Sequence, residues 1–187
     1  MKEDIKKAVE VLNKGGIILY PTDTIWGIGC DATNEEAVKR IYDLKKRTDS
    51  KSMLVLLDNP NRLRSYVDTV PDIAWDLIET SDKPMTIIYP NAKNLAKNLV
   101  AEDNSIGIRI TNEEFSAELA FRFRKPIVST SANISGNPAA KNFSEIDKEI
   151  IDNVDYVVKY KQEDNTKNSA SSIIKLGVGG EIKIIRD

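Results

Sequence analysis

The sequence predicts a single α/β domain built on a mixed sheet. Helical and strand-like hydrophobic patterns alternate along most of the chain, and the C-terminal part is rich in strand patterns. No stretch suited to a linker divides the 187 residues, a length ordinary for one domain. Alternating helices and strands favour parallel strand pairs, and consecutive strands in the tail add antiparallel ones. We therefore expect one domain over residues 1–187.

The N-terminal part of the chain predicts a helix, a buried strand and a second helix. Apolar residues recur at helical spacing across Ile5–Leu12, and Gly15-Gly16 supplies a C-terminal stop. The apolar run Ile17–Tyr20 is typical of a buried strand and ends at a proline. A second helix is expected from Thr33, because Thr33 and Glu36 have the spacing of a capping box.

The rest of the chain predicts more short elements of both kinds. Pro60 and Pro71 suit the first turns of two short helices, and a further helix is expected near Ser144. Thr111 and Glu114 make a second capping-box pair, which opens a helix through about Arg124. Short apolar runs predict strands at Met53–Leu57, Thr86–Tyr89, Ile106–Ile110, Pro126–Thr130, Tyr156–Lys159, Ser171–Leu176 and Glu181–Ile185. A hairpin is expected at 177–180, and a polar, mobile loop at 161–169.

The composition excludes several kinds of catalytic site. The chain has no histidine and one cysteine, Cys30, so Ser-His-Asp triads, Cys-His pairs and common zinc sites are excluded. Catalysis must come from carboxylates, Lys or Arg, hydroxyls, backbone groups or a hard cation such as Mg²⁺. A net charge of −2 argues against a generic nucleic-acid binder, although a local basic patch is compatible with it.

The chain shows no sign of a membrane segment. No apolar run approaches the roughly 18–20 residues that a membrane span needs. The N-terminal residues enter an amphipathic pattern directly and lack the apolar core of a signal peptide. We expect a cytoplasmic protein.

The first candidate site is the segment 20–29, directly after the first strand. Thr22 and Thr24 are two residues apart, so in extended backbone they point the same way. Gly27 and Gly29 allow a close approach of the backbone to another group. The segment matches neither a P-loop nor a dinucleotide-binding fingerprint. It is either a binding segment or a connection in which Thr and Asp form turn bonds.

The second candidate is the basic run that contains Lys45 and Arg47, with Lys51 beyond it. Cations at the end of a helix are also favoured by the helix dipole, so the run could be structural. Lys45 and Arg47 lie on different faces of a continuous helix, so they converge only if the helix ends at about Lys45. If they converge, a point charge and a planar fork together would clamp a polyphosphate.

The third candidate is the polar row Ser129, Ser131 and Asn133 at the end of a predicted strand. Alternation places these three on one face, with Thr130 and Ala132 opposite. Ligands of open α/β sheets bind beyond the carboxyl ends of strands, although turn bonds could also satisfy such groups. Arg109 also ends an apolar strand, where it would bind a carboxylate bidentately or form a structural salt bridge.

Taken in order, these segments resemble the YrdC/TsaC family, the threonylcarbamoyl-AMP synthases. The ordered set is specific although each stretch is weak alone. The matching stretches are Tyr20-Pro-Thr-Asp-Thr with Gly27-x-Gly29, Leu44-Lys-x-Arg47, Arg109, Ser129-Thr-Ser-Ala-Asn-x-Ser-Gly136, Ser171-Ser-Ile-Ile174 and the closing Gly-Gly-Glu-Ile with Arg186. The resemblance implies the short, single-domain form, with a twisted mixed sheet and a concave basic cavity.

The resemblance also implies a reaction and partners. L-threonine, bicarbonate and ATP would give threonylcarbamoyl-adenylate and pyrophosphate, with ATP as a substrate and Mg²⁺ expected beside it. A downstream tRNA threonylcarbamoyltransferase complex would then move the group to the adenosine beside the anticodon. The family is also credited with affinity for double-stranded RNA, which the acidic composition would confine to the cavity.

Carried over by position, the resemblance implies a role for each candidate residue. Lys45 and Arg47 would be catalytic. The residues that would face ATP are Lys45, Arg47, Lys51, Ser131, Asn133 and Arg186. Those nearer threonine would be Thr22, Ser52, Arg109, Ser129 and Ser171. Many members carry proline after the Lys-x-Arg and a later Pro-Leu, whereas this chain has Thr48 and Ser52-Met53 there.

Two readings from other functional classes remain open at the level of sequence. A non-catalytic RNA-binding or ribosome-associated module would use the same basic cavity and would bind duplex RNA in a salt-sensitive way. A nucleotide sensor would bind ATP without turning it over. A threonine-dependent change in Trp26 fluorescence would argue against the sensor.

Overall fold

The structure, a computed structural model, describes residues 1–47, 53–166 and 169–187. Its helices are α1 (Lys2–Asn13), α2 (Glu35–Leu44), α3 (Asp72–Thr80), α4 (Glu114–Phe123) and α5 (Lys148–Asp152), with 3₁₀ turns η1 (Pro60–Ser65) and η2 (Phe143–Glu145). Its strands are β1 (Ile18–Tyr20), β2 (Gly27–Gly29), β3 (Leu54–Leu57), β4 (Met85–Tyr89), β5 (Ile106–Ile110), β6 (Ile127–Ser131), β7 (Tyr156–Val157), β8 (Ser172–Leu176) and β9 (Ile182–Arg186).

The strands of the described residues form one sheet in the order β7-β1-β2-β6-β3-β5-β4-β8-β9. Parallel pairing joins β1 to β7, β3 to β5 and β4 to β8. The other neighbours pair antiparallel, including β2 with β6 and β6 with β3. The predicted mixed sheet is therefore confirmed, and β6 joins its two halves.

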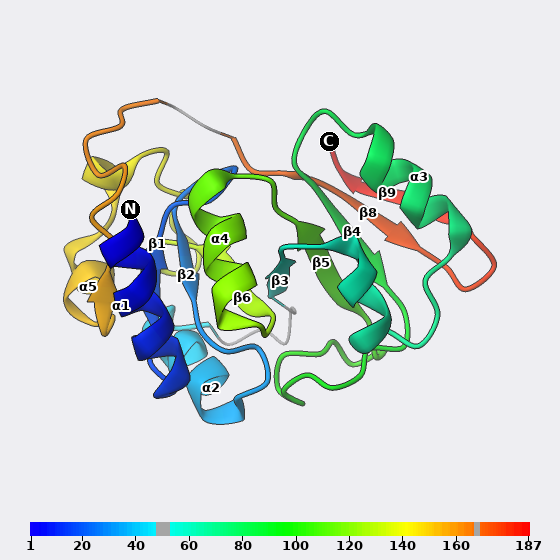
Figure 1. Cartoon of the computed structure of the whole chain (residues 1–187), viewed down its shortest axis with the longest axis horizontal. Coiled ribbons are helices and arrows are strands. Elements are labelled where there is room, and N and C mark those ends of the chain that lie inside the picture. The colour runs from blue at the N-terminus through cyan, green and yellow to red at the C-terminus, as the bar shows by residue number, and fades with distance from the viewer. Residues whose placement is uncertain (48–52, 167–168) are drawn as a thin grey trace.

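The helices cover parts of the sheet separately (Figure 1). α1 and α4 pack side by side, with α1 against β1 and β7 and α4 against β3, whereas α3 lies toward the end of the molecule that carries β8 and β9. α1 buries Ile5, Ala8 and Leu12, the positions that the helical pattern selects. Within the part of the chain that is described, no helix has the length and apolar character needed to cross a membrane.

The start of α2 differs from the sequence prediction by one residue, and its cap is different. Asn34 is the N-cap, and its side-chain oxygen accepts a hydrogen bond from the Ala37 backbone N–H. Thr33 instead donates its hydroxyl to the Asp31 carboxylate at 2.6 Å. The Thr33–Glu36 capping box was therefore wrong, because the carboxylate two residues earlier competes for the Thr33 hydroxyl.

The start of α4 is corrected in the same way. Glu113 is the N-cap, and its carboxylate accepts a hydrogen bond from the Ser116 backbone N–H at 2.8 Å. Thr111 exchanges a hydrogen bond with the Ser116 hydroxyl at 2.8 Å, so the capping box of Thr111 with Glu114 was wrong. The helix ends at Phe123, and Arg124 takes a left-handed conformation, in agreement with the predicted end.

Most predicted strands are present with ends that shift by one or two residues. The strand predicted at Tyr156–Lys159 is shorter, because only Tyr156–Val157 pairs with β1. Pro60 begins a 3₁₀ turn, and Pro71 is the N-cap of α3 rather than part of its first turn. The sequence did not predict β2 as a strand, because two of its three residues are glycine, which is depleted in strands.

Candidate functional site

Three arginines from distant parts of the chain line one cavity, which we call the arginine pocket. They are Arg47, Arg109 and Arg186, and the pocket has a volume of about 180 Å³. No carboxylate side chain borders it within the described residues. The remaining lining residues are Thr24, Ile25, Trp26, Gly27, Met53, Leu54, Ser129, Thr130, Ser131, Ala170, Ser171 and Ile173. The pocket is therefore basic, as predicted for the cavity.

The floor of the arginine pocket is built where β6 pairs with β2 and β3. Gly27 lies opposite Ser131, and Leu54 lies opposite Ser129. A Cβ on Gly27 would lie 3.2 Å from the Ser129 hydroxyl, and one on Gly29 would lie 2.6 Å from the Val128 carbonyl oxygen. The sequence predicted that the backbone at both glycines comes close to another group, and in the structure that group is strand β6. Ser129 and Ser131 face the pocket as expected, and Thr130, expected on the opposite face, also borders it.

Helix α2 ends where the Lys45–Arg47 hypothesis requires. Its last residue is Leu44, Lys45 is the C-cap, and Lys46 takes a left-handed conformation with φ of 50°. Because the left-handed Lys46 lies between them, Lys45 and Arg47 do not belong to one continuous helix. The predicted helix break at about Lys45 is confirmed.

The Lys45 ammonium is buried against the carboxyl end of β6. Its Nζ donates to the carbonyl oxygens of Ser131 and Asn133, the latter at 2.7 Å, and lies 3.4 Å from Asn133 Oδ1. These three acceptors match the three donors of an ammonium group. Burial, and then the charge of Arg47, lower the pKa of Lys45 to about 8. Lys45 does not line the arginine pocket, so in this conformation it supports the pocket wall.

Arg47 differs from Lys45 in facing the pocket directly. Its side chain is half-buried, and its guanidinium carbon lies 5.9 Å from the centre of the Tyr42 ring. Tyr42 lies on the last turn of α2, and its ring orients the Arg47 guanidinium beside the pocket.

Arg109 is the most buried of the three arginines, with 3% of its side chain exposed. Its Nη2 lies 3.0 Å from Asp23 Oδ1 and donates to the Thr24 hydroxyl at 3.3 Å. Neither Arg109 Nε nor Asp23 Oδ1 forms a hydrogen bond within the described residues, so their contact is a charge contact. Burial raises the pKa of Asp23, and Arg109 opposes that rise. Arg109 therefore forms the structural salt bridge that was one of its two alternatives, and it also lines the pocket in which the other alternative would bind a carboxylate.

Arg186 and Ser171 bring the C-terminal part of the chain to the arginine pocket. The Arg186 guanidinium donates to the Ser171 carbonyl oxygen through Nε at 2.9 Å and Nη2 at 2.7 Å. The Ser171 hydroxyl pairs with Thr86 Oγ1 at 2.9 Å and is buried. Arg186 from β9 is therefore fixed at the edge of the pocket by the residue that precedes β8.

Thr22 and Asn133 lie next to the pocket rather than on its wall. The hydroxyls of Thr22 and Thr24 are 3.0 Å apart, as their spacing predicts, and Thr22 also donates to the Ile25 carbonyl. Thr22 lines a smaller adjoining cavity that shares Thr24, Ile25 and Trp26 with the arginine pocket. The Asn133 amide donates to the Asn137 carbonyl at 2.7 Å, which is the turn bond that the alternative interpretation expected.

Two predicted site residues, Lys51 and Ser52, lie outside the described residues, and so does Thr48. Sequence reasoning did not assign roles to Asp23 and Thr24, which contact Arg109. An available signal was the position of Asp23 between two threonines directly after a buried strand, where a charged side chain needs a partner.

The family model Sua5/yciO/yrdC, described as "Telomere recombination", matches residues 10–187. The chain belongs to this family. A relative from Pseudoalteromonas translucida, named threonylcarbamoyl-AMP synthase, is 34% identical over 181 residues, 95% of each chain. A Pseudomonas aeruginosa protein of the same name is 34% identical over 152 residues, 81% of this chain and 82% of its own.

Solved structures of the Sua5/YciO/YrdC family have the same fold. YciO of E. coli superposes with a TM-score of 0.85 at 22% identity, covering 100% of this chain and 90% of YciO. P. abyssi Sua5 in complex with L-threonine gives a TM-score of 0.82 at 22% identity over 92% of this chain. The match spans 50% of that Sua5 chain. At this identity, the likeness shows the family fold alone.

Proposed function

We propose that this protein is a threonylcarbamoyl-AMP synthase, a nucleotidyltransferase that prepares the threonylcarbamoyl group for tRNA modification. The observation that carries the proposal is the arginine pocket, where Arg47, Arg109 and Arg186 meet the β6 serines and no carboxylate stands among the described residues of the wall. Such a site suits substrates with several negative charges. The synthase names of relatives that are 34% identical over most of the chain support the same activity.

The proposed reaction needs positioning and charge neutralisation rather than a protein nucleophile. The threonine amine and bicarbonate form a carbamate with loss of water. A carbamate oxygen then attacks the α-phosphorus of ATP, and pyrophosphate leaves. Both steps are helped by holding the reactants together and by cations near the phosphate oxygens. The absence of histidine is compatible with this chemistry.

We assign the basic groups near α2, β6 and β9 to ATP, and those near β5 and β8 to threonine. The proposed ATP residues are Lys45, Arg47, Lys51, Ser131, Asn133 and Arg186. The proposed threonine residues are Thr22, Ser52, Arg109, Ser129 and Ser171. Arg109 is the natural partner of the threonine carboxylate, because it lines the pocket and a guanidinium can bind a carboxylate through two hydrogen bonds. Lys45 would act by holding β6 and by adding positive charge behind Arg47.

Mg²⁺ would enter as part of the nucleotide substrate. Within the described ranges, no group of three or more Asp, Glu, Cys or His side chains is arranged to hold a metal ion. Mg²⁺ commonly keeps several waters and is bound through substrate phosphates, so a protein cage is not required. We further propose that residues 1–187 act as one unit in the cytoplasm and hand their product to a tRNA threonylcarbamoyltransferase complex.

A non-catalytic RNA-binding module is less favoured. The three arginines surround a pocket of about 180 Å³, which is smaller than a groove that would follow an RNA duplex. Binding of RNA within the cavity remains compatible with the charge of the pocket. It would be weakened by ATP if the two ligands share the arginines.

The test is a reaction with L-threonine, bicarbonate, ATP and Mg²⁺, with mass spectrometry of the adduct and measurement of pyrophosphate. Each substrate is omitted in turn. The Arg47→Ala variant should lose about 10²–10³ in rate, the usual effect of removing one charge-stabilising donor. Arg122→Ala is the matched control, because Arg122 is exposed on α4 and pairs with Glu118 away from the pocket. Folded protein without threonine-dependent pyrophosphate release would contradict the proposal.

A further inference from the structure

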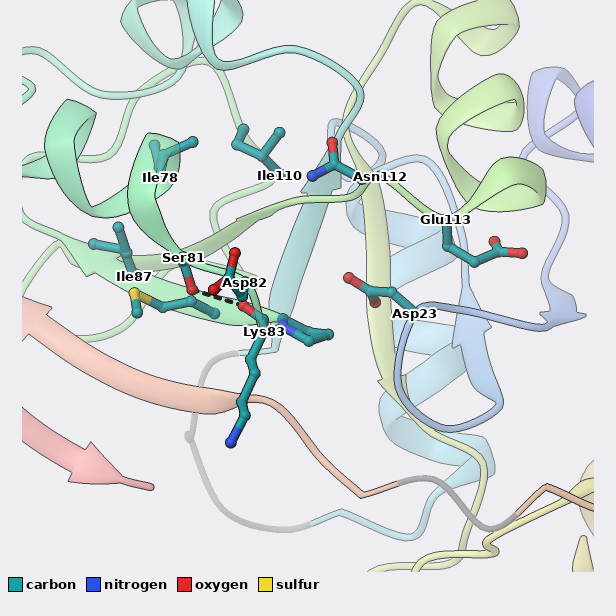
Figure 2. A pocket seen from close by; sticks show the side chains of 11 residues that line it. Asp23, Ile78, Ser81, Asp82, Lys83, Ile87, Ile110, Asn112 and Glu113 are labelled. Carbon is teal, nitrogen blue, oxygen red and sulfur yellow. Dashed lines mark hydrogen bonds between the residues drawn. The ribbon is translucent and has the colours of Figure 1, made fainter.

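Asp23 lies between the arginine pocket and a second cavity. This second cavity, which we call the Asp23 cavity, has a volume of about 340 Å³ and lies against α3, β4 and the start of α4. Figure 2 shows the Asp23 carboxylate pointing from the β1–β2 connection toward this cavity, across from Asp82 and Lys83. Arg109 and Thr24 line the arginine pocket instead. The Asp23–Arg109 ion pair therefore spans the two cavities.

The two partners of the Arg109 guanidinium come from one short connection. Asp23 supplies a negative charge 3.0 Å from Nη2, and Thr24 supplies a neutral hydroxyl 3.3 Å from the same nitrogen. With 3% of its side chain exposed, Arg109 has little water to stabilise its charge. A buried guanidinium without a counter-charge is strongly unfavourable, so Asp23 determines where this charge is held.

The contact with Asp23 leaves part of the guanidinium unused. Arginine carries five N–H donors in one plane, and the Nε hydrogen of Arg109 has no acceptor within the described residues. Because Nη2 is held by Asp23 and Thr24, the orientation of the whole plane is set before a ligand arrives. Because Arg109 lines the arginine pocket, a carboxylate that binds there meets a guanidinium whose plane is already oriented.

We propose that Asp23 is a positioning residue for threonine binding, which fixes the plane of the Arg109 guanidinium without touching the substrate. This inference rests on the proposed function, in which Arg109 receives the threonine carboxylate. Asp23 lines the Asp23 cavity and not the arginine pocket, so its effect on threonine must pass through Arg109.

The decisive variant is Asp23→Asn, which keeps the size of the side chain and removes its charge. We expect the threonine Kd from titration calorimetry, and the threonine KM, to rise by about tenfold to a hundredfold. Removing a side chain that orients a metal ligand has an effect of this size in metal sites, and Asp23 orients Arg109 in the same way. ATP affinity, and kcat at saturating threonine, should change by less than about threefold, because the ATP residues are untouched.

Two further variants separate positioning from a general structural role. Asp82→Asn is the matched control, because Asp82 is a second carboxylate of the Asp23 cavity and is exposed. It should leave the threonine Kd unchanged. In an Arg109→Lys background, Asp23→Asn should add little, because the guanidinium plane on which it acts is already gone.

Asp23→Glu keeps the charge and serves if Asp23→Asn does not fold. Its extra methylene can extend into the Asp23 cavity, so we expect a folded protein with a threonine Kd raised severalfold and unchanged ATP affinity. A threonine Kd equal to that of the parent in a folded Asp23 variant would overturn the inference. So would an equal loss of threonine and ATP affinity, or an additive effect in the Arg109→Lys background.

The same measurements distinguish this inference from the proposed function. If the parent protein binds threonine but forms no adduct, the synthase proposal fails, and Asp23 is still judged by the change in Kd. If the parent protein binds no threonine at all, both proposals are overturned.

Discussion

Lys45 shows how one side chain joins two distant parts of the chain. Its ammonium rests on carbonyl groups of Ser131 and Asn133, at the end of the strand that carries the pocket serines. The backbone N–H of Ser135 donates in return to the Lys45 carbonyl at 2.9 Å. The end of α2 and the turn after β6 are thus fastened to each other, and the charge of Lys45 lies behind Arg47.

The lowered pKa of Lys45 predicts a pH-dependent ATP affinity. Deprotonation near pH 8 removes a positive charge from behind the pocket, so the Kd for ATP should rise between pH 7 and pH 9. In the unfolded chain this lysine holds its proton to about pH 10.5, so its titration makes the fold more stable above pH 8. A loss of ATP binding in that window is therefore not explained by unfolding through this group.

Titration calorimetry with ATP at several pH values tests this prediction. Lys46→Asn is the matched control, because Lys46 is exposed, pairs with Glu149, and has a left-handed backbone that Asn tolerates. The control should keep the pH dependence of the parent. An ATP affinity that stays constant from pH 7 to pH 9 would contradict a role for the Lys45 charge.

Helix starts and the glycine-containing strand β2 were the elements that the sequence predicted least well. Both capping-box pairs have the correct spacing, yet Asn34 and Glu113 form the actual caps. The competing acceptor for the Thr33 hydroxyl is Asp31, a residue outside the motif. The sequence did not predict β2, because its glycines are explained by close packing against β6. Strand propensity, which depends on local sequence, gives no information about that packing.

The cap of α2 gives a stability prediction. Asn34→Ala removes the acceptor of the Ala37 N–H and should lower the free energy of unfolding by about 1 kcal/mol. Glu36→Gln, at the other end of the predicted capping box, should change it by less than about 0.5 kcal/mol, as expected for an exposed residue. Urea unfolding of both variants provides the measurement. A larger loss in Glu36→Gln than in Asn34→Ala would favour the original capping box.

At the scale of the whole molecule, the sequence predicted the mixed sheet and the arginines and serines of the pocket, while their contacts required the structure. The ordered motifs placed Arg47, Arg109, Ser129, Ser171 and Arg186 in one site, and the structure brings them together. The sequence could not show that Lys45 faces β6 or that Asp23 meets Arg109. These pairs are 86 residues apart or more, and their contacts depend on strand order.

Substrate binding should stabilise the whole fold. A ligand at about 100 times its Kd adds roughly 2.7 kcal/mol, which for a protein of this size corresponds to a rise in Tm of about 5–10 °C. Threonine and ATP together should raise Tm more than either alone in differential scanning fluorimetry. Arg109→Ala should remove the threonine contribution, and Arg122→Ala should retain it. An equal response to threonine in Arg109→Ala would contradict the assignment of Arg109.

The parallel pairing of β1 with β7 has a consequence for how the protein folds. The Ile17 N–H bonds to the carboxylate of Asp155, 138 residues later, and the Tyr156 hydroxyl bonds to Asp4. A chain emerging from the ribosome cannot form these contacts until its last fifth is made, so the first strand waits with one edge unpaired. Closing such long loops is slow, so this protein should acquire its final form only near the end of synthesis.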